Sequence, residues 1–182
     1  TLRFLAAHRE RLPGQRFAIN LAPSTVCRVQ FPLEVSRLLA KYAIEPWQLI
    51  FEVTECSTFC NAEQALHILR QLQKMGVRIA IDDFGTGYAS YARLKSVDAD
   101  ILKIDGSFIR NIVNNSLDYQ IVASICHLAR MKKMLVVAEY VESEEIRSAV
   151  HALGIDYVQG YLIGRPAPLE SLLEAETSCA DA

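Results

Sequence analysis

Short apolar runs alternate with longer amphipathic stretches along the chain. The amphipathic stretches repeat apolar residues every three or four positions, as one face of a helix does, whereas the short runs have the length of buried strands. Strands that alternate with helices predict parallel pairing with right-handed crossovers in an α/β protein. The predicted strands are 16–19, 49–51, 77–81, 99–102, 134–138 and 155–158, and the predicted helices are 1–11, 32–42, 62–75, 88–94, 117–131, 144–153 and 168–175.

Each predicted strand leads into a polar residue. In a (β/α)8 barrel the carboxyl ends of all strands meet in one ring, whereas an open doubly wound sheet places its chemistry in one crevice. Contributions from every strand favour a TIM-like (β/α)8 barrel. A barrel needs eight strands and about 250 residues, so we expect residues 1–182 to form a single partial domain that lacks its first strand or strands and a helix. The polar residues are Asn20, Glu52, Asp82, Lys103, Glu139 and Gln159.

The composition narrows the class of protein. The 182 residues are 51% hydrophobic with a net charge of −2, which suits one hydrophobic core. No stretch concentrates Lys and Arg without acids, so we expect no nucleic-acid polymer as a partner. No apolar run reaches the ~18 residues that span a bilayer, so any membrane attachment is expected through domains outside this chain. Five cysteines without a Cys-x-x-Cys pair indicate reduced thiols and a cytoplasmic location.

Two adjacent carboxylates, Asp82 and Asp83, follow the predicted strand 77–81 and precede the turn Gly85-Thr86-Gly87. Carboxylates at the edge of a core repel each other and are costly to desolvate, and a divalent cation removes both penalties. A plainer interpretation also stands, in which Asp83 caps the next helix and Asp82 is solvated. The turn lacks the third glycine of a dinucleotide fingerprint, and the chain has no Gly-x-x-x-x-Gly-Lys loop, which disfavours dehydrogenase and kinase functions.

The strand-end residues together suggest a kind of metal site. Carboxylate and amide oxygens select Mg²⁺, Mn²⁺ or Ca²⁺ over zinc. Asp82 and Asp83 can serve two ions about 4 Å apart, the arrangement that clamps the attacking and leaving oxygens in phosphodiester hydrolysis. Lys103 lies among the acids, with three roles open: it binds a phosphate oxygen, holds the attacking water or neutralises a neighbour. The oxygen ligands are Asn20, Glu52, Asp82, Asp83 and Glu139.

Six motifs carry a resemblance to a known family. They are Asn20-Leu21-Ala22, Glu52-Val53-Thr54-Glu55, Asp82-Asp83-Phe84-Gly85-Thr86-Gly87-Tyr88-Ala89-Ser90, Lys103-Ile104-Asp105, Ala138-Glu139-Tyr140-Val141-Glu142 and Gln159-Gly160-Tyr161-Leu162. In this order they resemble the motifs N-x-S, E-x-T-E, D-D-F-G-T-G-Y-S-S, K-I-D, A-E-G-V-E and Q-G-Y of the EAL domains, which are bacterial phosphodiesterases of cyclic di-GMP. The likeness covers essentially the whole chain.

The resemblance implies a metal-dependent enzyme that hydrolyses cyclic di-GMP to linear pGpG and so regulates bacterial motility and biofilm formation. Mg²⁺ or Mn²⁺ is the implied cofactor, in a two-metal site. Asn20, Glu52 and Asp82 are the implied ligands of one ion. Asp82 would bridge to a second ion, which Asp83 and Glu139 also bind. Lys103 would orient the attacking water, which makes Lys103, Glu139 and Asp83 the expected catalytic residues.

The resemblance also implies a supporting set around the metal ligands. Gln159 would support the second metal site. Glu55 would hold the loop after Asp83, a loop that takes part in dimerisation in this family, so a homodimer is expected. The supporting residues are Glu55, Asp105, Glu142 and Gln159.

The chain departs from the family pattern at several positions. Ala22 and Ala89 replace serines, and Tyr140 replaces a glycine between Glu139 and Glu142. The namesake Glu-x-Leu motif would lie upstream of Thr1, and we expect a chain that really began there to be inactive and poorly stable. An alternative function therefore stands beside hydrolysis: a catalytically inactive EAL domain that binds cyclic di-GMP or a partner protein.

Overall fold

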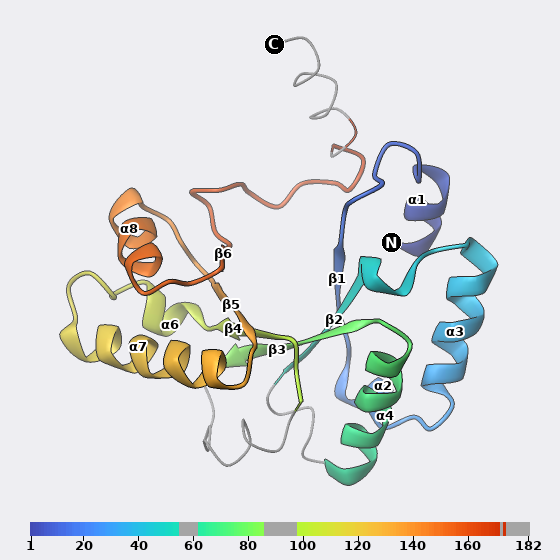
Figure 1. The fold of residues 1–182 in the computed structure, drawn as a ribbon. Coiled ribbons are helices and arrows are strands. Elements are labelled where there is room, and N and C mark those ends of the chain that lie inside the picture. Colours follow the sequence, from blue (N-terminus) through green and yellow to red (C-terminus); the bar gives the residue numbers. More distant parts are fainter. Residues whose placement is uncertain (55–61, 86–97, 172, 174–182) are drawn as a thin grey trace.

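A six-stranded sheet forms the centre of the computed structural model, which describes residues 1–54, 62–85, 98–171 and 173. The strands lie in the order β1 to β6, and each neighbouring pair is parallel. The sheet curls, with helices along its outer side (Figure 1), so the predicted α/β fold of a TIM-like barrel is confirmed. The strands are β1 (Phe17–Asn20), β2 (Leu49–Thr54), β3 (Arg78–Phe84), β4 (Ile101–Ile104), β5 (Leu135–Ala138) and β6 (Tyr157–Val158).

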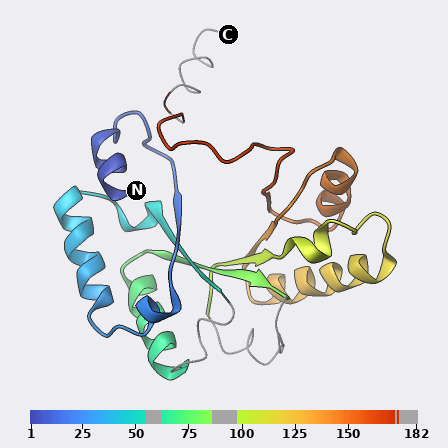
Figure 2. The ribbon, with the colours of Figure 1, turned by 180° about the vertical axis from the view of Figure 1, so that it is seen from behind.

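The helices form two groups, one beside each half of the sheet. Helices α1 to α4 flank the β1 side and α6 to α8 flank the β6 side, as the views from front and back both show (Figure 2). After β6, the chain crosses between the groups, and Arg11 donates a hydrogen bond to the carbonyl of Leu173. The helices are α1 (Leu2–Ala7), α2 (Pro23–Val26), α3 (Phe31–Tyr42), the 3-10 helix Pro46–Gln48, α4 (Ala62–Lys74), α6 (Gly106–Ile109), α7 (Ser116–Met131) and α8 (Glu144–Ala152).

Four predicted helices are confirmed to within one or two residues at each end, as α3, α4, α7 and α8. Local capping explains several ends: the side chain of Asn115 accepts hydrogen bonds from two backbone N–H groups of α7, and Ser143 accepts one from Ile146 in α8. The predicted first helix was too long, since α1 ends at Ala7. The short helices α2, α6 and 46–48 were not predicted. The predicted helix 88–94, and residues 172, 174 and 175 of the last one, lie outside the described residues.

Alternate residues of the strands face opposite sides of the sheet. In β2, Leu49, Phe51 and Val53 are buried in the core that the outer helices cover, while Ile50 and Glu52 face the inner side of the curl. A cavity of about 220 Å³ lies along this inner face. Its lining residues come from all six strands or from positions next to them: Arg16, Ile50, Glu52, Arg78, Ala80, Ile101, Lys103, Leu135, Val137, Tyr157 and Gln159.

Two aspartates connect neighbouring strands by hydrogen bonds at the amino ends of the strands. Asp100 Oδ2 accepts a hydrogen bond of 2.8 Å from the backbone N–H of Ile79 and one of 3.0 Å from Gln73 Nε2. Asp156 Oδ2 accepts one of 2.8 Å from the backbone N–H of Val136. The backbone N–H groups of both aspartates donate in return to the carbonyls of Ile79 and Val136. These reciprocal pairs begin the β3–β4 and β5–β6 ladders.

Two cysteines of the described residues, Cys27 and Cys126, are free thiols. Burial raises the pKa of Cys126 to about 11. The other three cysteines lie outside the described residues. In the part of the chain that is described, no helix is both long and apolar enough to cross a membrane.

Candidate active site

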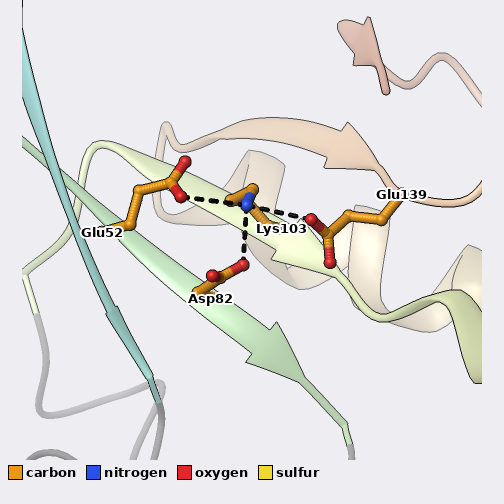
Figure 3. Close-up of polar contacts among 4 residues, drawn as sticks. All are labelled: Glu52, Asp82, Lys103 and Glu139. Carbon is orange, nitrogen blue, oxygen red and sulfur yellow. Dashed lines mark hydrogen bonds and ion pairs between the residues drawn. The ribbon is translucent and has the colours of Figure 1, made fainter. Parts of the chain in front are cut away.

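Lys103 contacts three carboxylates from three different strand ends (Figure 3). Its Nζ lies 2.8 Å from Asp82 Oδ1, 2.9 Å from Glu139 Oε1 and 3.2 Å from Glu52 Oε2. The four side chains are only 6% to 13% exposed. Because the strands are parallel and adjacent, residues far apart in the sequence meet at one edge of the sheet.

Burial and charge shift the pKa values of this cluster in opposite directions. Burial raises the pKa of Glu52 and of Glu139, and the Lys103 ammonium only partly offsets it. Burial alone would lower the pKa of Lys103, but its contacts with Asp82, Glu139 and Glu52 raise that pKa above its ordinary value. Lys103 therefore remains protonated at neutral pH. A single positive charge faces three carboxylates, which leaves the cluster with an excess of acceptor oxygens and negative charge.

A β-bulge brings the adjacent residues Asp82 and Asp83 to the same site. Between Ile81 and Phe84 the pairing with β4 shifts register: β3 advances by three residues while β4 advances by two. Asp83 adopts a left-handed backbone conformation at φ 53°. In a regular strand, adjacent side chains point to opposite faces, whereas a bulge redirects one of them. Desolvation and the neighbouring Asp82 raise the pKa of Asp83.

Asp82, Asp83 and Glu139 form a group with the geometry of a metal site. Each offers one carboxylate oxygen, and these oxygens all lie within 4.8 Å of one another. The Lys103 ammonium lies 2.8 Å from Asp82 Oδ1, and the described residues bring no other donor to this buried oxygen. An under-used carboxylate oxygen in an all-oxygen, negatively charged cluster fits a hard divalent cation. The residues present therefore fit a metal ion.

The other predicted site residues lie around this centre. Asn20 ends β1 opposite Glu52 in the register, and Gln159 lines the same cavity as Glu52 and Lys103. Asp105 caps α6, where its side chain accepts a hydrogen bond of 2.8 Å from the Ser107 backbone N–H. Glu142 is exposed. Glu55 lies outside the described residues, as does the loop from residue 86 onward.

Two arginines of the inner face were missed by the sequence analysis. Arg16 and Arg78 line the cavity that also contains Glu52 and Lys103. The alternation of side chains could have found them, since Arg78 lies four positions before Asp82 and Arg16 four positions before Asn20. They place positive charge on the inner face toward the amino ends of the strands.

The EAL domain family model matches residues 1–166. The chain belongs to the EAL domain family. Curated relatives agree with this assignment. The chain is 71% identical over 177 residues to the cyclic di-GMP phosphodiesterase PdeF of Escherichia coli, covering 97% of this chain and 24% of that protein. It is 50% identical over 168 residues to the probable cyclic di-GMP phosphodiesterase PdeA of the same organism, covering 92% and 23%. The chain thus spans about a quarter of the length of these relatives.

Solved EAL domain structures have the same fold. The MucR phosphodiesterase in complex with c-di-GMP superposes with a TM-score of 0.86 at 38% identity, covering 94% of this EAL domain chain and 70% of that one. The relative MucR is from Pseudomonas aeruginosa. The EAL domain of Mycobacterium smegmatis DcpA superposes with a TM-score of 0.87 at 30% identity, covering 96% and 81%.

Proposed function

We propose that this protein hydrolyses cyclic di-GMP to linear pGpG in the cytoplasm, in a reaction that depends on Mg²⁺ or Mn²⁺. The observation that carries the proposal is the buried cluster in which Lys103 contacts Glu52, Asp82 and Glu139, with Asp83 turned toward the same site by a bulge. Support comes from the 71% identity to a cyclic di-GMP phosphodiesterase. The substrate carries two phosphodiesters, whose negative charge suits a site able to hold divalent cations.

The chain's oxygen ligands divide into two sets. Asp82, Asp83 and Glu139 would hold one ion, as their mutual distances support. Asn20 and Glu52 face each other in the register of β1 and β2 and would hold a second ion together with Asp82. When bound, such ions supply Lewis acidity toward a phosphodiester.

Lys103 acts as a hydrogen-bond donor rather than a base. Its contacts with the three carboxylates raise its pKa, which favours the protonated ammonium, a hydrogen-bond donor. An ammonium has three N–H groups, and Lys103 directs them among three carboxylates. In the proposed reaction, Lys103 turns one of these donors to the oxygen of the attacking water and orients it toward the phosphorus. Gln159 lies on the same inner face and supports the Glu139 side of the site.

Incubation of the intact purified protein with cyclic di-GMP tests the proposal. We expect pGpG to appear with Mg²⁺ or Mn²⁺ and to vanish with a chelator. Absence of pGpG with either ion, at neutral and at alkaline pH, would refute hydrolysis. If the protein then still bound cyclic di-GMP, the alternative of a non-hydrolytic binding domain would replace it.

The substitution Asp82→Asn provides the matched test within the site. It removes one negative charge from the group shared by both proposed ligand sets while keeping the size of the side chain, so hydrolysis should be abolished. Glu142→Gln is the comparison variant and should reduce hydrolysis less completely, because Glu142 is exposed and lies outside the cluster. Chromatography of pGpG measures both variants, and equal losses would show that Asp82 is not a shared ligand.

A homodimer formed through the loop after Asp83 is also proposed. Phe84 ends β3 and Gly85 follows it at the start of that loop, where Gly85 packs against the ring of Phe108. The rest of the loop and Glu55 lie outside the described residues. Light scattering of the intact protein with and without Glu55→Ala would measure the oligomeric state; a dimer unaffected by this change would contradict the role of Glu55.

A further inference from the structure

Tyr140 has a backbone conformation that favours glycine, directly beside the carboxylate Glu139. Its φ is 54°, in the left-handed region that bulky residues rarely adopt. The backbone on both sides is held: the Glu139 N–H donates to the Ile104 carbonyl at 3.2 Å, and the Val141 N–H donates to the Gln159 carbonyl at 3.0 Å. Tyr140 therefore lies between two backbone hydrogen bonds, one to the end of β4 and one to the residue that follows β6.

The ring of Tyr140 lies against the helix that begins three residues after Lys103. A Cβ atom added at Gly106 would meet the Tyr140 side chain at 2.1 to 2.8 Å, so only glycine leaves room for it. The Arg110 guanidinium carbon lies 4.1 Å from the ring centroid, a distance typical of a cation–π contact. Gly106 and Arg110 are four residues apart, which places them on one side of α6.

The packing of Tyr140 on Gly106 and Arg110 therefore lies between the two segments that carry Lys103 and Glu139. Lys103 is in β4, which continues through Asp105 into α6, and Glu139 directly precedes Tyr140. Their ion pair is 2.9 Å long, and Glu139 also belongs to the group with metal-site geometry. The β4–β5 ladder ends at the pair Ile104 and Ala138. Beyond it, the contact of Tyr140 with Gly106 and Arg110 joins the start of α6 to the segment after β5.

We propose that Tyr140 is a positioning residue, whose ring, packed on Gly106 and Arg110, holds the Glu139 carboxylate in place for divalent-cation binding. The inference rests on the proposed function, since it assumes that Glu139 is a metal ligand. The ring carries the effect rather than the hydroxyl, because Gly106 and Arg110 meet the ring and the Cβ atom.

Calorimetric titration of the intact, metal-free protein with Mn²⁺ tests the proposal without any turnover. Loss of groups that orient a metal ligand typically lowers metal affinity by about 10- to 100-fold. We expect Tyr140→Gly to weaken Mn²⁺ binding by about 10-fold, while Tyr140→Phe binds as the wild type does. Arg110→Met should give a smaller loss, and Arg147→Met is its control, since Arg147 is an exposed arginine paired only with Glu144 among the described residues.

A double-mutant cycle separates this role from a general loss of structure. Gly106→Ala should weaken Mn²⁺ binding in the wild type, because the added methyl displaces the ring, but should have no further effect in Tyr140→Gly. The thermal midpoint in chelator serves as the structural readout, and Tyr140→Gly should keep it because glycine suits this φ. Additive effects of the two substitutions, or an unchanged Mn²⁺ affinity in Tyr140→Gly, would overturn the role of Tyr140 but leave the proposed function standing. A wild-type protein that binds no Mn²⁺ would overturn both the proposed function and the inference.

Discussion

Carboxylates occur at both ends of the parallel sheet, in opposite surroundings. At the amino ends, Asp100 and Asp156 accept hydrogen bonds from backbone N–H groups of the neighbouring strands. At the carboxyl ends, three buried carboxylates surround one ammonium, and the pKa values of Glu52 and Glu139 are raised by burial. The same chemical group thus joins strands at one end and accumulates uncompensated charge at the other.

Positive φ values occur near both ends of the sheet, but before the strands they lie just after helices, at Gly76, Lys133 and Gly154. Asp83 and Tyr140, at the carboxyl ends of β3 and β5, both have positive φ values, and β3 contains a bulge there. The described amino ends of β4 and β6 continue regular ladders. Strained conformations and unsatisfied charge persist where the surrounding structure holds them, and they concentrate at functional sites. The comparison predicts that substitutions at the carboxyl ends affect function, whereas substitutions at the amino ends affect stability.

The largest effect is expected for Lys103→Met, which leaves three buried carboxylates without their cation. Removal of one partner from a buried charge cluster costs about 3–5 kcal/mol, and pGpG formation should be lost. Urea unfolding in the presence of a chelator measures the free energy of unfolding. Full stability in Lys103→Met would show that the cluster is far better solvated than its burial indicates, and the contrast between the two ends would fail.

Asp100→Ala should lower the free energy of unfolding by about 1–3 kcal/mol, because it leaves the Ile79 N–H and the Gln73 amide without their acceptor. Asp156→Ala removes one such bond and should cost less. Asp98→Ala is the matched control, since its ion pair with Arg70 is exposed and worth about 0–1 kcal/mol. Mn²⁺ affinity should be unchanged in all three variants. A weakened Mn²⁺ affinity in Asp100→Ala would show that the two ends are coupled.

Asp83→Gly tests at a single residue whether the carboxyl ends of the strands serve metal binding rather than stability. Glycine relieves the left-handed conformation but increases the entropy of the unfolded chain, so stability should stay within about 1 kcal/mol of the wild type. Mn²⁺ affinity should fall, because one carboxylate leaves the group with metal-site geometry. Calorimetry and urea unfolding on the same preparation measure both quantities. A large loss of stability with unchanged Mn²⁺ affinity would make Asp83 a structural residue.

The smallest effect expected is a pH dependence of stability at the carboxyl ends. Burial raises the pKa of Glu139, so the folded protein binds that proton more tightly than the unfolded chain does. Its contribution to stability is therefore present below the ordinary pKa of a glutamate and is lost as pH rises through the raised value. In chelator, the wild type should lose stability relative to Glu139→Gln as pH rises above the ordinary pKa of a glutamate, about 4.3. The opposite slope would mean that Lys103 lowers the pKa of Glu139.

Local patterns in the sequence predict most of the helices and strands and the polar residues at the strand ends. Apolar periodicity located the four long helices, and all six predicted strands are present, because burial of one helix face or one short run leaves a local pattern. Glu52, Asp82, Lys103 and Glu139 were found as polar residues at the ends of such runs. The capping of α7 by Asn115 and of α8 by Ser143 also follows from residues beside the helix.

How these residues meet depends on contacts between distant parts of the chain. Regular alternation would point Asp82 and Asp83 to opposite faces, and only the bulge against β4 brings both to one site. The sequence left three roles open for Lys103, and the curl of the sheet places its ammonium among three carboxylates. Tyr140 stood out in the sequence, but its partners Gly106 and Arg110 did not. Such contacts join residues distant in the chain, and their energy depends on packing that no local pattern records.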